Sequence, residues 1–595
     1  MGLAARLRRE WRYLTGLART LARVRSIGPN SRNLVCDDLE AAVDRWRTRP
    51  AVAFEGVALS YGELDATANR YAHWARAQGI ERGAAVALLL PNRLEYLPIW
   101  YGLTKMGVAA ALINNQLVGA DLAHCLNISG ARHCLVDAQT QGALEGARGL
   151  LERPIEAWSL SPPQGDQRDL AKALEGLSDA RPAPSLRSGM TAGDTALYIY
   201  TSGTTGLPKA ARITHMRAQL YMRGFAGATG ARPTDRLYLT LPLYHATGGL
   251  CAMGAALLNG GSVALRSVFS ASRFWDDVVG EEATLFVYIG ELWRYLAAQP
   301  SHPLERAHKL RLAFGNGLGA DLWPTISDRF GVPRILEFYG STEGNVSMFN
   351  FDGTPGAIGR WPPYLGGLFN VALARFDMET QRPVRGLDGF CIKTATGEVG
   401  ECLGQIHQSV RTAYSGYVDK TASESKVLGD AFRRGDRWFQ TGDLMTRDKE
   451  GCFFFVDRIG DTFRWKGQNV STTEVAQRLA AAPGVREATV YGVTIEHLDG
   501  RAGMAALVVG DDFDLAEFGR YVTRALAPYA QPLFLRLMAE LATTGTFKHR
   551  KMALVADGFD PGKIASSLYV RDRGEGYRPL TADLYAKIVA GEVRL

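Results

Sequence analysis

Short apolar runs alternate with helix-like patterns over much of the chain. Between residues 51 and 150, apolar stretches of strand length are separated by segments whose apolar positions recur every three or four residues, which is typical of α/β units. Residues 85–90 predict a buried strand, Pro91-Asn92 predicts a turn, and the apolar residues that follow predict a buried helix. Similar runs predict strands at residues 237–241, 262–265 and 284–289.

The pattern changes near residue 460. Residues 485–493 and 503–509 predict two strands, and a helical pattern follows near residues 515–526, as expected for a compact α/β domain. The join is placed at Asp457-Arg458-Ile459-Gly460-Asp461. We therefore expect three parts, with a basic amphipathic arm at residues 1–30, a large domain at 31–459 and a small domain at 460–595.

The first 27 residues form a basic segment with one apolar stripe. They contain seven arginines against Glu10 alone, which accounts for +6 of the chain's net charge of +7. A helix would gather its larger apolar side chains on one face, at Leu3, Leu7, Trp11, Leu14, Leu21 and Val24. Such a helix suits an anionic membrane surface, and two other interpretations stay open: docking on the protein's own body, or a targeting presequence.

No segment predicts a membrane-spanning helix. The most apolar region, residues 84–113, is interrupted by Arg93, Glu95 and Lys105, and 18 uninterrupted apolar residues never occur. Seven scattered cysteines without a CxxC pair argue against a disulfide framework and a zinc cluster, and for a reducing compartment. Outside the arm the charge is nearly balanced, which gives no indication of nucleic-acid binding.

Residues 198–209 read YIYTSGTTGLPK, a buried strand that runs into small residues. Glycine allows the backbone to approach phosphate oxygens, and hydroxyl and N–H groups donate hydrogen bonds to them. The spacing is not that of the Walker A loop, because Leu207 and Pro208 separate Gly206 from Lys209. The segment predicts a binding site for a nucleoside triphosphate, formed by Tyr200, Thr201, Ser202, Gly203, Thr204, Thr205, Gly206 and Lys209.

Two further glycine-rich turns follow predicted strands. The first contains Gly315, Asn316 and Gly317, and the second, at residues 338–343, reads FYGSTE. In open α/β sheets, ligands bind beyond the carboxyl ends of the strands, so these exits predict one shared site.

Together these segments resemble the superfamily of acyl-adenylating enzymes, over nearly the whole chain after the arm. The resemblance rests on ordered motifs: YTSGTTGLPK (200–209), PLYHATGG (242–249), FYGSTE (338–343), YSGYVDK with TGD (414–420, 441–443), VDRIGDTFRWKGQNVSTTEVA (456–476) and the weaker TGTFKHRK (544–551). FRRGDRWFQTGDL (432–444) and GNGL (315–318) look most like the branch of fatty acid transport proteins and very-long-chain acyl-CoA synthetases.

This resemblance implies an α/β fold, with a large multi-sheet adenylate-forming domain and a small mobile C-terminal α/β domain. It also implies two reaction steps. A carboxylate attacks the α-phosphate of ATP to give an acyl-adenylate and pyrophosphate, and the thiol of coenzyme A then displaces AMP.

The resemblance assigns the phosphate site residue by residue. The loop from Thr201 to Lys209 would wrap the β- and γ-phosphates, and Thr342 would contact the α-phosphate. Glu343 would bind Mg²⁺, which prefers hard oxygen ligands, together with Thr204. Around the base, Tyr339 would stack on adenine with Gly340 and Ser341 beside it, and the turn of Gly315, Asn316 and Gly317 would border the same ring.

Other roles follow from the later motifs. Asp443 would accept hydrogen bonds from the ribose hydroxyls, and Arg458 would add a second ribose contact. His245 would lie near the acyl carboxylate, at the entrance to the acyl tunnel. We expect Lys548 to be the catalytic lysine in preference to Lys551.

The pivot between the domains is expected within residues 459–461, where this chain has Gly460 in place of the more usual Asp or Lys. Lys466 and Gly467 would line the pantetheine tunnel of coenzyme A.

The resulting hypothesis is an ATP-dependent fatty acyl-CoA synthetase that acts on long or very long chains, with fatty acid, ATP and coenzyme A as partners and a cytoplasmic, peripheral place at the inner membrane surface. Two alternatives remain: a CoA ligase for a bulkier acid such as a bile or sterol acid, and a non-catalytic fatty acid transport or binding protein. The sequence leaves open the chain length, the oligomeric state, with a homodimer as one option, and a role in fatty acid uptake.

Overall fold

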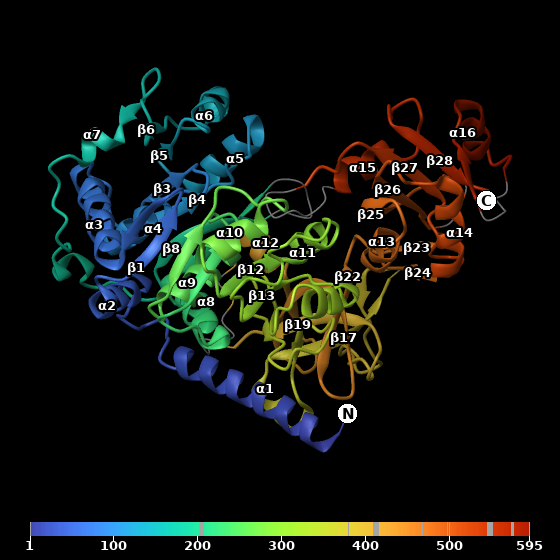
Figure 1. Ribbon diagram of the computed structural model, residues 1–595, viewed down its shortest axis with the longest axis horizontal. Coiled ribbons are helices and arrows are strands. Elements are labelled where there is room, and N and C mark those ends of the chain that lie inside the picture. Colours follow the sequence, from blue (N-terminus) through green and yellow to red (C-terminus); the bar gives the residue numbers. More distant parts are fainter. Residues whose placement is uncertain are drawn as a thin grey trace. The chain divides into compact units, whose positions relative to one another are not determined.

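The structure is a computed structural model that describes residues 2–593, except 202–207, 379, 408–413, 415, 466–467, 497, 499, 544–550 and 573–575. The chain divides into two compact units. Unit 1 comprises residues 1–360, 404–428 and 437–439, and unit 2 comprises 361–403, 429–436 and 440–595. Figure 1 shows the α/β character that the sequence predicts, with several sheets and helices along them.

Unit 1 contains two large, mainly parallel sheets. The first has eight strands in the order β15-β14-β13-β12-β10-β11-β1-β2, and the second has seven in the order β7-β6-β5-β3-β4-β8-β9. The strands of the first sheet are β1 (Pro50–Phe54), β2 (Val57–Ser60), β10 (Arg236–Leu239), β11 (Ser262–Leu265), β12 (Leu285–Ile289), β13 (Leu312–Asn316), β14 (Ile335–Gly340) and β15 (Ser347–Phe349). The strands of the second are β3 (Ala85–Leu88), β4 (Ala109–Leu112), β5 (His133–Val136), β6 (Glu156–Ser159), β7 (Arg168–Asp169), β8 (Thr195–Thr201) and β9 (Lys209–Thr214).

Helices connect these strands. The α-helices of unit 1 are α1 (Leu3–Val24), α2 (Val35–Trp46), α3 (Tyr61–Ala77), α4 (Tyr96–Lys105), α5 (Gly119–Ser129), α6 (Gln141–Ala147), α7 (Leu170–Leu174), α8 (His215–Thr229), α9 (Met253–Leu257), α10 (Phe274–Gly280), α11 (Gly290–Ala297) and α12 (Lys420–Glu424). Shorter turns of 3-10 or π type are η1 (Arg148–Leu150), η2 (Pro184–Arg187), η3 (Thr247–Ala252), η4 (Ala320–Leu322) and η5 (Thr325–Arg329), and β16 (Gly359–Arg360) is a short strand.

The strands predicted in unit 1 are confirmed within a few residues. The buried strand expected at 85–90 is β3, and the helix expected after the turn is α4. Every residue of α4 is buried. The β-strands are buried on both faces because helices cover the parallel sheet, which explains why they appear in the sequence as continuous apolar runs. Among the described residues no helix is long and apolar enough to cross a bilayer.

Unit 2 contains the smaller sheets. One has the strands β22-β21-β19-β17-β18 in that order, one is the hairpin β23-β24, and one has five strands in the order β25-β26-β27-β28-β29. Their bounds are β17 (Val371–Asp377), β18 (Arg382–Pro383), β19 (Gly400–Gln405), β20 (Val427–Gly429), β21 (Arg437–Arg447), β22 (Cys452–Arg458), β23 (Phe463–Trp465), β24 (Gln468–Val470), β25 (Val485–Val493), β26 (Ala502–Val509), β27 (Phe534–Met538), β28 (Ser567–Arg571) and β29 (Tyr577–Pro579).

Four α-helices of unit 2 contribute buried side chains to the same apolar core as the five-stranded sheet: α13 (Thr472–Ala480), α14 (Leu515–Ala525), α15 (Lys551–Asp557) and α16 (Ala582–Val589). The 3-10 helix η6 (Pro363–Leu368) also belongs to unit 2. The predicted strands at 485–493 and 503–509 and the helix near 515–526 are therefore confirmed as β25, β26 and α14. Buried side chains of β25, β26 and α14 belong to one apolar core.

The predicted N-terminal helix is confirmed as α1, which docks on unit 1 (Figure 1). It is bound through Tyr13, Gly16, Thr20 and Val24, all buried. The Tyr13 hydroxyl donates to the carbonyl of Arg360 at 2.8 Å. Docking on the protein's own body, one of the interpretations left open by the sequence, is thus observed. Val24 of the predicted apolar stripe is buried, whereas Leu3, Leu7, Trp11 and Leu14 of the same stripe stay exposed.

The contact between α1 and α8 depends on a glycine. A Cβ atom on Gly227 of α8 would lie 2.7 Å from the Thr20 Cα and 2.9 Å from the Arg19 carbonyl oxygen, both in the backbone of α1. Gly224, one turn earlier on α8, has no atom within 4 Å of its corresponding position. The two helices therefore approach closely at one point only because that position lacks a side chain.

We expect Gly227→Ala to destabilise unit 1 and to loosen α1. Overpacking of this kind costs about 1–3 kcal/mol, more than the roughly 0.8–1 kcal/mol that Ala gains over Gly as a helix former. Thermal unfolding and proteolysis between α1 and α2 would measure both effects. Gly224→Ala is the matched control and should unfold at the wild-type temperature or above it. Equal melting temperatures and equal proteolysis for the two variants would contradict this account.

Candidate active site

Three predicted site segments of unit 1 follow parallel strands of the eight-stranded sheet, and the phosphate-loop motif lies between β8 and β9 of the other sheet. β10, β12, β13 and β14 run parallel, so their carboxyl ends lie at the same edge. The His245 segment follows β10, and the FYGSTE turn lies at the end of β14. The sheet therefore gathers segments that are far apart in the sequence at the edge where α/β proteins bind ligands.

The turn after β13 is shaped by glycines. Gly317 has φ +83°, a left-handed conformation that glycine adopts without strain. A Cβ atom on Gly315 would lie 2.2 Å from the Tyr288 carbonyl oxygen, and one on Gly290 would lie 1.8 Å from that of Gly317. The Oδ1 atom of Asn316 is buried and has no hydrogen-bond partner among the described residues. The turn thus presents one buried acceptor for which the described part of the chain supplies no donor.

Glu337 of β14 holds this turn in place. It is 1% exposed and pairs with Gly315 across the sheet. Its carboxyl oxygens accept hydrogen bonds from the N–H groups of Gly317 at 3.1 Å and Leu318 at 3.2 Å, and from the Tyr288 hydroxyl at 2.7 Å. Burial raises the pKa of Glu337 to about 8, and the three hydrogen bonds oppose that rise.

The FYGSTE segment leaves β14 through an irregular turn. Tyr339 and Gly340 are still paired with β15, at Met348 and Ser347. The Ser341 hydroxyl then accepts a hydrogen bond from the Gly344 N–H at 3.1 Å, which closes the turn that carries Thr342 and Glu343. Both of these residues are half-buried.

Tyr417 brings the Glu343 turn together with the phosphate-loop motif. Its hydroxyl donates to the Glu343 Oε1 at 2.8 Å, and the Thr201 side chain lies near enough to the same hydroxyl to oppose the rise of its pKa. The Lys209 ammonium lies 5.7 Å from the centre of the Tyr417 ring. Burial, with the Glu343 carboxylate nearby, raises the pKa of Tyr417, so the hydroxyl remains a donor at neutral pH.

The strands on either side of the phosphate loop are well defined. β8 and β9 are antiparallel, and Thr201 pairs with Lys209 where the loop begins and ends. The Tyr200 side chain points into the core, where its hydroxyl donates to the Cys125 carbonyl at 2.9 Å. Its predicted part in nucleotide binding is therefore restricted to the backbone. The loop residues Ser202, Gly203, Thr204, Thr205 and Gly206 lie outside the described residues.

The His245 segment forms a tight turn. Gly248 and Gly249 permit this turn because neither has a side chain. A Cβ atom on Gly248 would lie 2.4 Å from the Pro242 carbonyl oxygen, and one on Gly249 would lie 2.1 Å from the Leu243 carbonyl oxygen. The Gly249 N–H donates to the His245 carbonyl at 2.7 Å, and the π-type helix η3 begins there. The His245 ring packs against that of Tyr244, with centroids 4.6 Å apart.

Asp443 and Arg458 form a pair within unit 2. They are register partners on β21 and β22, and the Arg458 Nε lies 3.2 Å from the Asp443 Oδ1. The Asp443 side chain is 6% exposed and that of Arg458 is 52% exposed. The structure therefore brings together these two predicted ribose ligands from segments 15 residues apart.

The region predicted as the pivot follows β22. Gly460 has φ +96°, which requires glycine, and its position is open on all sides. Lys551 is engaged elsewhere in unit 2, where its ammonium donates to the Thr472 hydroxyl at 2.8 Å and lies 3.5 Å from Asp461. Lys466, Gly467 and Lys548 lie outside the described residues.

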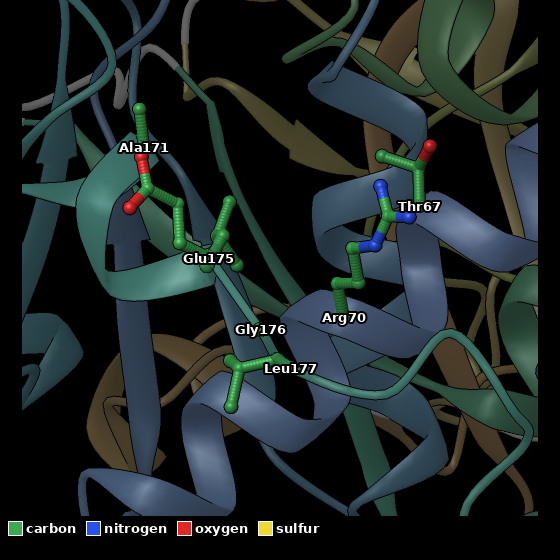
Figure 2. A pocket seen from close by; sticks show the side chains of 7 residues that line it. Thr67, Arg70, Ala171, Glu175, Gly176 and Leu177 are labelled. Carbon is green, nitrogen blue, oxygen red and sulfur yellow. The ribbon is translucent and has the colours of Figure 1, made fainter.

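A surface pocket of about 400 Å³ lies away from these residues. Figure 2 shows Thr67 and Arg70 of α3 on one side of it and Glu175 with Leu177, which follow α7, on the other. None of its lining residues belongs to a motif predicted to bind the nucleotide.

Three residues that contact the predicted site were not identified from the sequence. They are Arg217, which binds the carbonyl groups of the Glu343 turn, together with Glu337 and Tyr417. Tyr417 lies inside the quoted motif YSGYVDK and Glu337 directly precedes FYGSTE, so position in the sequence was a signal for both. Arg217 carries no such signal, because its target is more than 120 residues away.

Family comparisons agree with the motif order. The model of the AMP-binding enzyme family matches residues 39–403, and the model of the AMP-binding enzyme C-terminal domain matches residues 474–548. The long-chain fatty acid transport protein 6 of Mus musculus is 39% identical over 569 residues, which cover 94% of this chain and 91% of that protein. The long-chain fatty acid transport protein 3 of Homo sapiens is 43% identical over 521 residues, covering 86% and 76%.

Solved structures share the fold. An anthranilate CoA ligase in complex with anthranoyl-AMP superimposes with a TM-score of 0.75 at 22% identity, over 90% of this chain and 98% of that one. A fatty acyl CoA synthetase of Mycobacterium tuberculosis gives a TM-score of 0.61 at 22% identity, over 88% and 98%. The predicted fold class is thereby confirmed.

We expect the buried Glu337 carboxyl to make stability depend on pH. Its pKa is about 8 in the folded chain against 4.5 for an ordinary Glu, so between these values the folded state retains a proton that the unfolded state has lost. Stability from this group is complete at low pH and falls as the pH rises through about 8, by up to roughly 1.4 kcal/mol per pH unit.

Thermal unfolding at pH 6 and pH 9 would measure this effect. The wild type should lose more stability between the two than Glu337→Gln, which cannot ionise, and the exposed control Glu175→Gln should behave as the wild type. The same pH dependence in all three proteins would exclude the proton on Glu337 as its source.

Proposed function

The chain belongs to the family of AMP-binding enzymes, and on that premise we propose that it is an ATP-dependent fatty acyl-CoA synthetase for long or very long chains. The relatives that support the acid are named long-chain fatty acid transport proteins and are 39–43% identical. A link to fatty acid uptake is part of the same proposal, since conversion to a CoA ester would retain an acid that has entered the cell.

The observation that carries the proposal is the set of contacts around Tyr417. They join Thr201, Lys209 and Glu343, which are the ends of the phosphate loop and the acidic residue of the FYGSTE motif. A cation, a hydroxyl and a carboxylate at the carboxyl edge of a parallel sheet suit a triphosphate with its metal ion.

In the first step, a carboxylate oxygen of the fatty acid forms a bond to the α-phosphorus, and the bond to pyrophosphate breaks. We assign Lys209 and the loop to the departing phosphates, Thr342 to the α-phosphate and Lys548 to the negative charge shared by the attacking and transferring groups. His245 would border the acyl carboxylate. In the second step, the sulfur of coenzyme A attacks the acyl carbonyl, the thiol loses its proton and AMP departs.

Magnesium fits the residues that are present. Among the described residues no cluster of three or more His, Cys, Asp or Glu could hold a metal by itself, and Glu343 supplies one carboxylate. Mg²⁺ is commonly bound through one or two carboxylates together with phosphates and water, so Glu343, with Thr204, would hold it. Bound there, the ion would neutralise phosphate charge.

The remaining assignments follow the family pattern. Asp443 and Arg458 would bind the ribose. The adenine would be bound by Tyr339, Gly340 and Ser341 and by the turn of Gly315, Asn316 and Gly317. The pantetheine arm would be bound by Lys466 and Gly467. The pairing of Asp443 with Arg458 supports the first of these, because it places a hydrogen-bond acceptor and a hydrogen-bond donor side by side.

Pyrophosphate release across acids from C8 to C24 and cholate, with and without coenzyme A, tests this proposal. We expect release with long-chain acids, and acyl-CoA formation only when the thiol is present. Release with cholate alone would favour the bulkier-acid ligase, and no release with any acid would reject the synthetase in favour of a transport or binding protein.

Lys548→Ala serves as the internal control of the same assay. It should lower adenylation by about 10²-fold or more and leave thioester formation from a supplied acyl-adenylate intact, because the lysine acts on the charge of the first transition state. Lys551→Ala should retain adenylation, since Lys551 is occupied by Asp461 and Thr472. Equal loss of both half-reactions in Lys548→Ala would refute this role.

We further propose that α1 rests on an anionic membrane while it remains docked on unit 1. Leu3, Leu7, Trp11 and Leu14 are exposed by 75%, 62%, 69% and 45%, at the spacing of one helix face. The arginines on the remaining surface, such as the exposed Arg8 and Arg12, suit anionic headgroups. All seven cysteines are free and buried, which supports a reducing, cytoplasmic side of that membrane.

Replacing Leu7 and Trp11 by Ser should weaken binding to vesicles with roughly one-third phosphatidylserine by about tenfold or more, because each side chain contributes about 1.5–3 kcal/mol when buried. Sedimentation with vesicles measures the fraction of protein that is bound. Val57→Ser with Val268→Ser removes equally exposed apolar residues elsewhere and should bind as the wild type. Substitution is preferable to deletion of α1, which would uncover the surface around Gly227. Undiminished binding of the Leu7/Trp11 variant would discard the membrane role.

A further inference from the structure

The turn that carries Thr342 and Glu343 is held from behind by one guanidinium. The Arg217 Nη2 donates to the carbonyl oxygens of Ser341 at 3.0 Å and Thr342 at 3.2 Å, and also to that of Gly344. Three carbonyl groups of four consecutive residues therefore converge on one nitrogen. Hydrogen bonds from an ionised donor are shorter and stronger than neutral ones, so this contact restricts the peptide groups on both sides of Glu343.

Tyr221 reinforces the same contact from one helical turn further along α8. Its hydroxyl accepts a hydrogen bond from Arg217 at 2.9 Å, and it lies 3.0 Å from the Ser341 carbonyl oxygen and 3.1 Å from that of Thr342. The guanidinium carbon is 5.0 Å from the centre of the Tyr221 ring. The i, i+4 spacing on a helix places the two side chains on one face.

α8 fixes Arg217 at a well-defined place. Thr214 caps the helix, its hydroxyl accepting the Arg217 N–H at 3.2 Å, so Arg217 lies in the first turn. α8 directly follows β9, the strand that begins at Lys209. The helix thereby links the second end of the phosphate loop to the Glu343 turn.

The charge on Arg217 has no acidic partner among the residues that the structure describes. The residue is 7% exposed, its side-chain hydrogen bonds among these residues go to carbonyl groups and one phenol, and its buried Nε has no partner there. A purely structural arginine at such depth is normally paired with a carboxylate. A buried positive charge balanced only by dipoles favours an anion at the turn it holds.

We propose that Arg217, supported by Tyr221, is a positioning residue for adenylation, which sets the backbone of the Ser341–Gly344 turn so that Thr342 and Glu343 meet the phosphates of ATP. This inference rests on the proposed function, since it takes those two residues as ligands of the phosphate and the metal. Arg217 acts through the turn, and misplacement of a catalytic group by about 1 Å can cost about 10²-fold in rate.

Hydrogen–deuterium exchange tests the positioning itself, independently of any activity. Arg217→Met should speed exchange in the peptide covering residues 338–346, because the carbonyl anchors are lost, and Arg217→Lys should speed it to a smaller degree, since a single ammonium cannot reproduce the planar fork. Arg76→Met, an exposed arginine of α3, is the matched control and should exchange as the wild type.

The half-reactions test the consequence. Arg217→Met should lower kcat for pyrophosphate release by about 10²-fold while the dissociation constant for a fluorescent ATP analogue changes far less, because the lost contact acts on geometry reached in the transition state. The Mg²⁺ concentration for half-maximal rate should rise. Tyr221→Phe removes the hydroxyl that accepts from Arg217 and donates to the turn but leaves Arg217 in place, and it should cost about fivefold.

Three results would overturn the inference. They are unchanged exchange at residues 338–346, retention of adenylation within about threefold in Arg217→Met, and an equal loss of adenylation and of thioester formation that follows the melting temperature. If the wild type releases no pyrophosphate with any acid, the proposed function fails by itself, and the exchange measurement still decides whether Arg217 positions the turn.

Discussion

The convergence of three backbone carbonyl groups on the buried guanidinium of Arg217 is the contact on which the arrangement of the Ser341–Gly344 turn depends. A turn of polar residues at the end of a strand has no ladder to hold it and would otherwise adopt several conformations. Here its backbone is bound on the inner side by Arg217 and Tyr221, and its carboxylate is bound by Tyr417. The acidic residue is thereby restrained at two places, through hydrogen bonds from two different segments, α8 and the segment of Tyr417.

α8 has a wider role than that contact alone. Its first turn binds the Glu343 turn, and Cys251 of η3 lies close enough to Arg217 for the guanidinium to influence the pKa of its thiol. Its last turns accept α1 at Gly227. A single helix, capped by Thr214 and ended by Gly230 in a left-handed conformation, therefore contacts the turn after β14, the segment after His245 and the N-terminal helix. Anything that displaced α1 would act on the same helix that orders the turn.

A second buried group explains the turn after β13. Glu337 accepts hydrogen bonds from two consecutive N–H groups and a phenol, so a carboxyl from the next strand fixes a glycine-rich turn. Both glycine turns of the predicted nucleotide site are thus held by buried side chains of neighbouring elements. Glycine permits their conformations, and the buried partners select one of them.

The sequence by itself determined the α/β class, most strands and the order of the motifs, because apolar runs, glycine-rich exits and the amphipathic pattern of α1 are local properties of the chain. It also predicted which side chains are chemically suited to bind a nucleotide and its metal ion: Thr201, Lys209, Glu343, Asp443 and Arg458. Tertiary structure alone decided that Tyr417 joins the first three and that Arg217 holds a turn more than 120 residues away. It also decided that α1 docks through Tyr13 and Thr20 while Leu3, Leu7, Trp11 and Leu14 stay exposed. These contacts depend on which strands are neighbours and how closely two helices approach, and neither is encoded in local spacing.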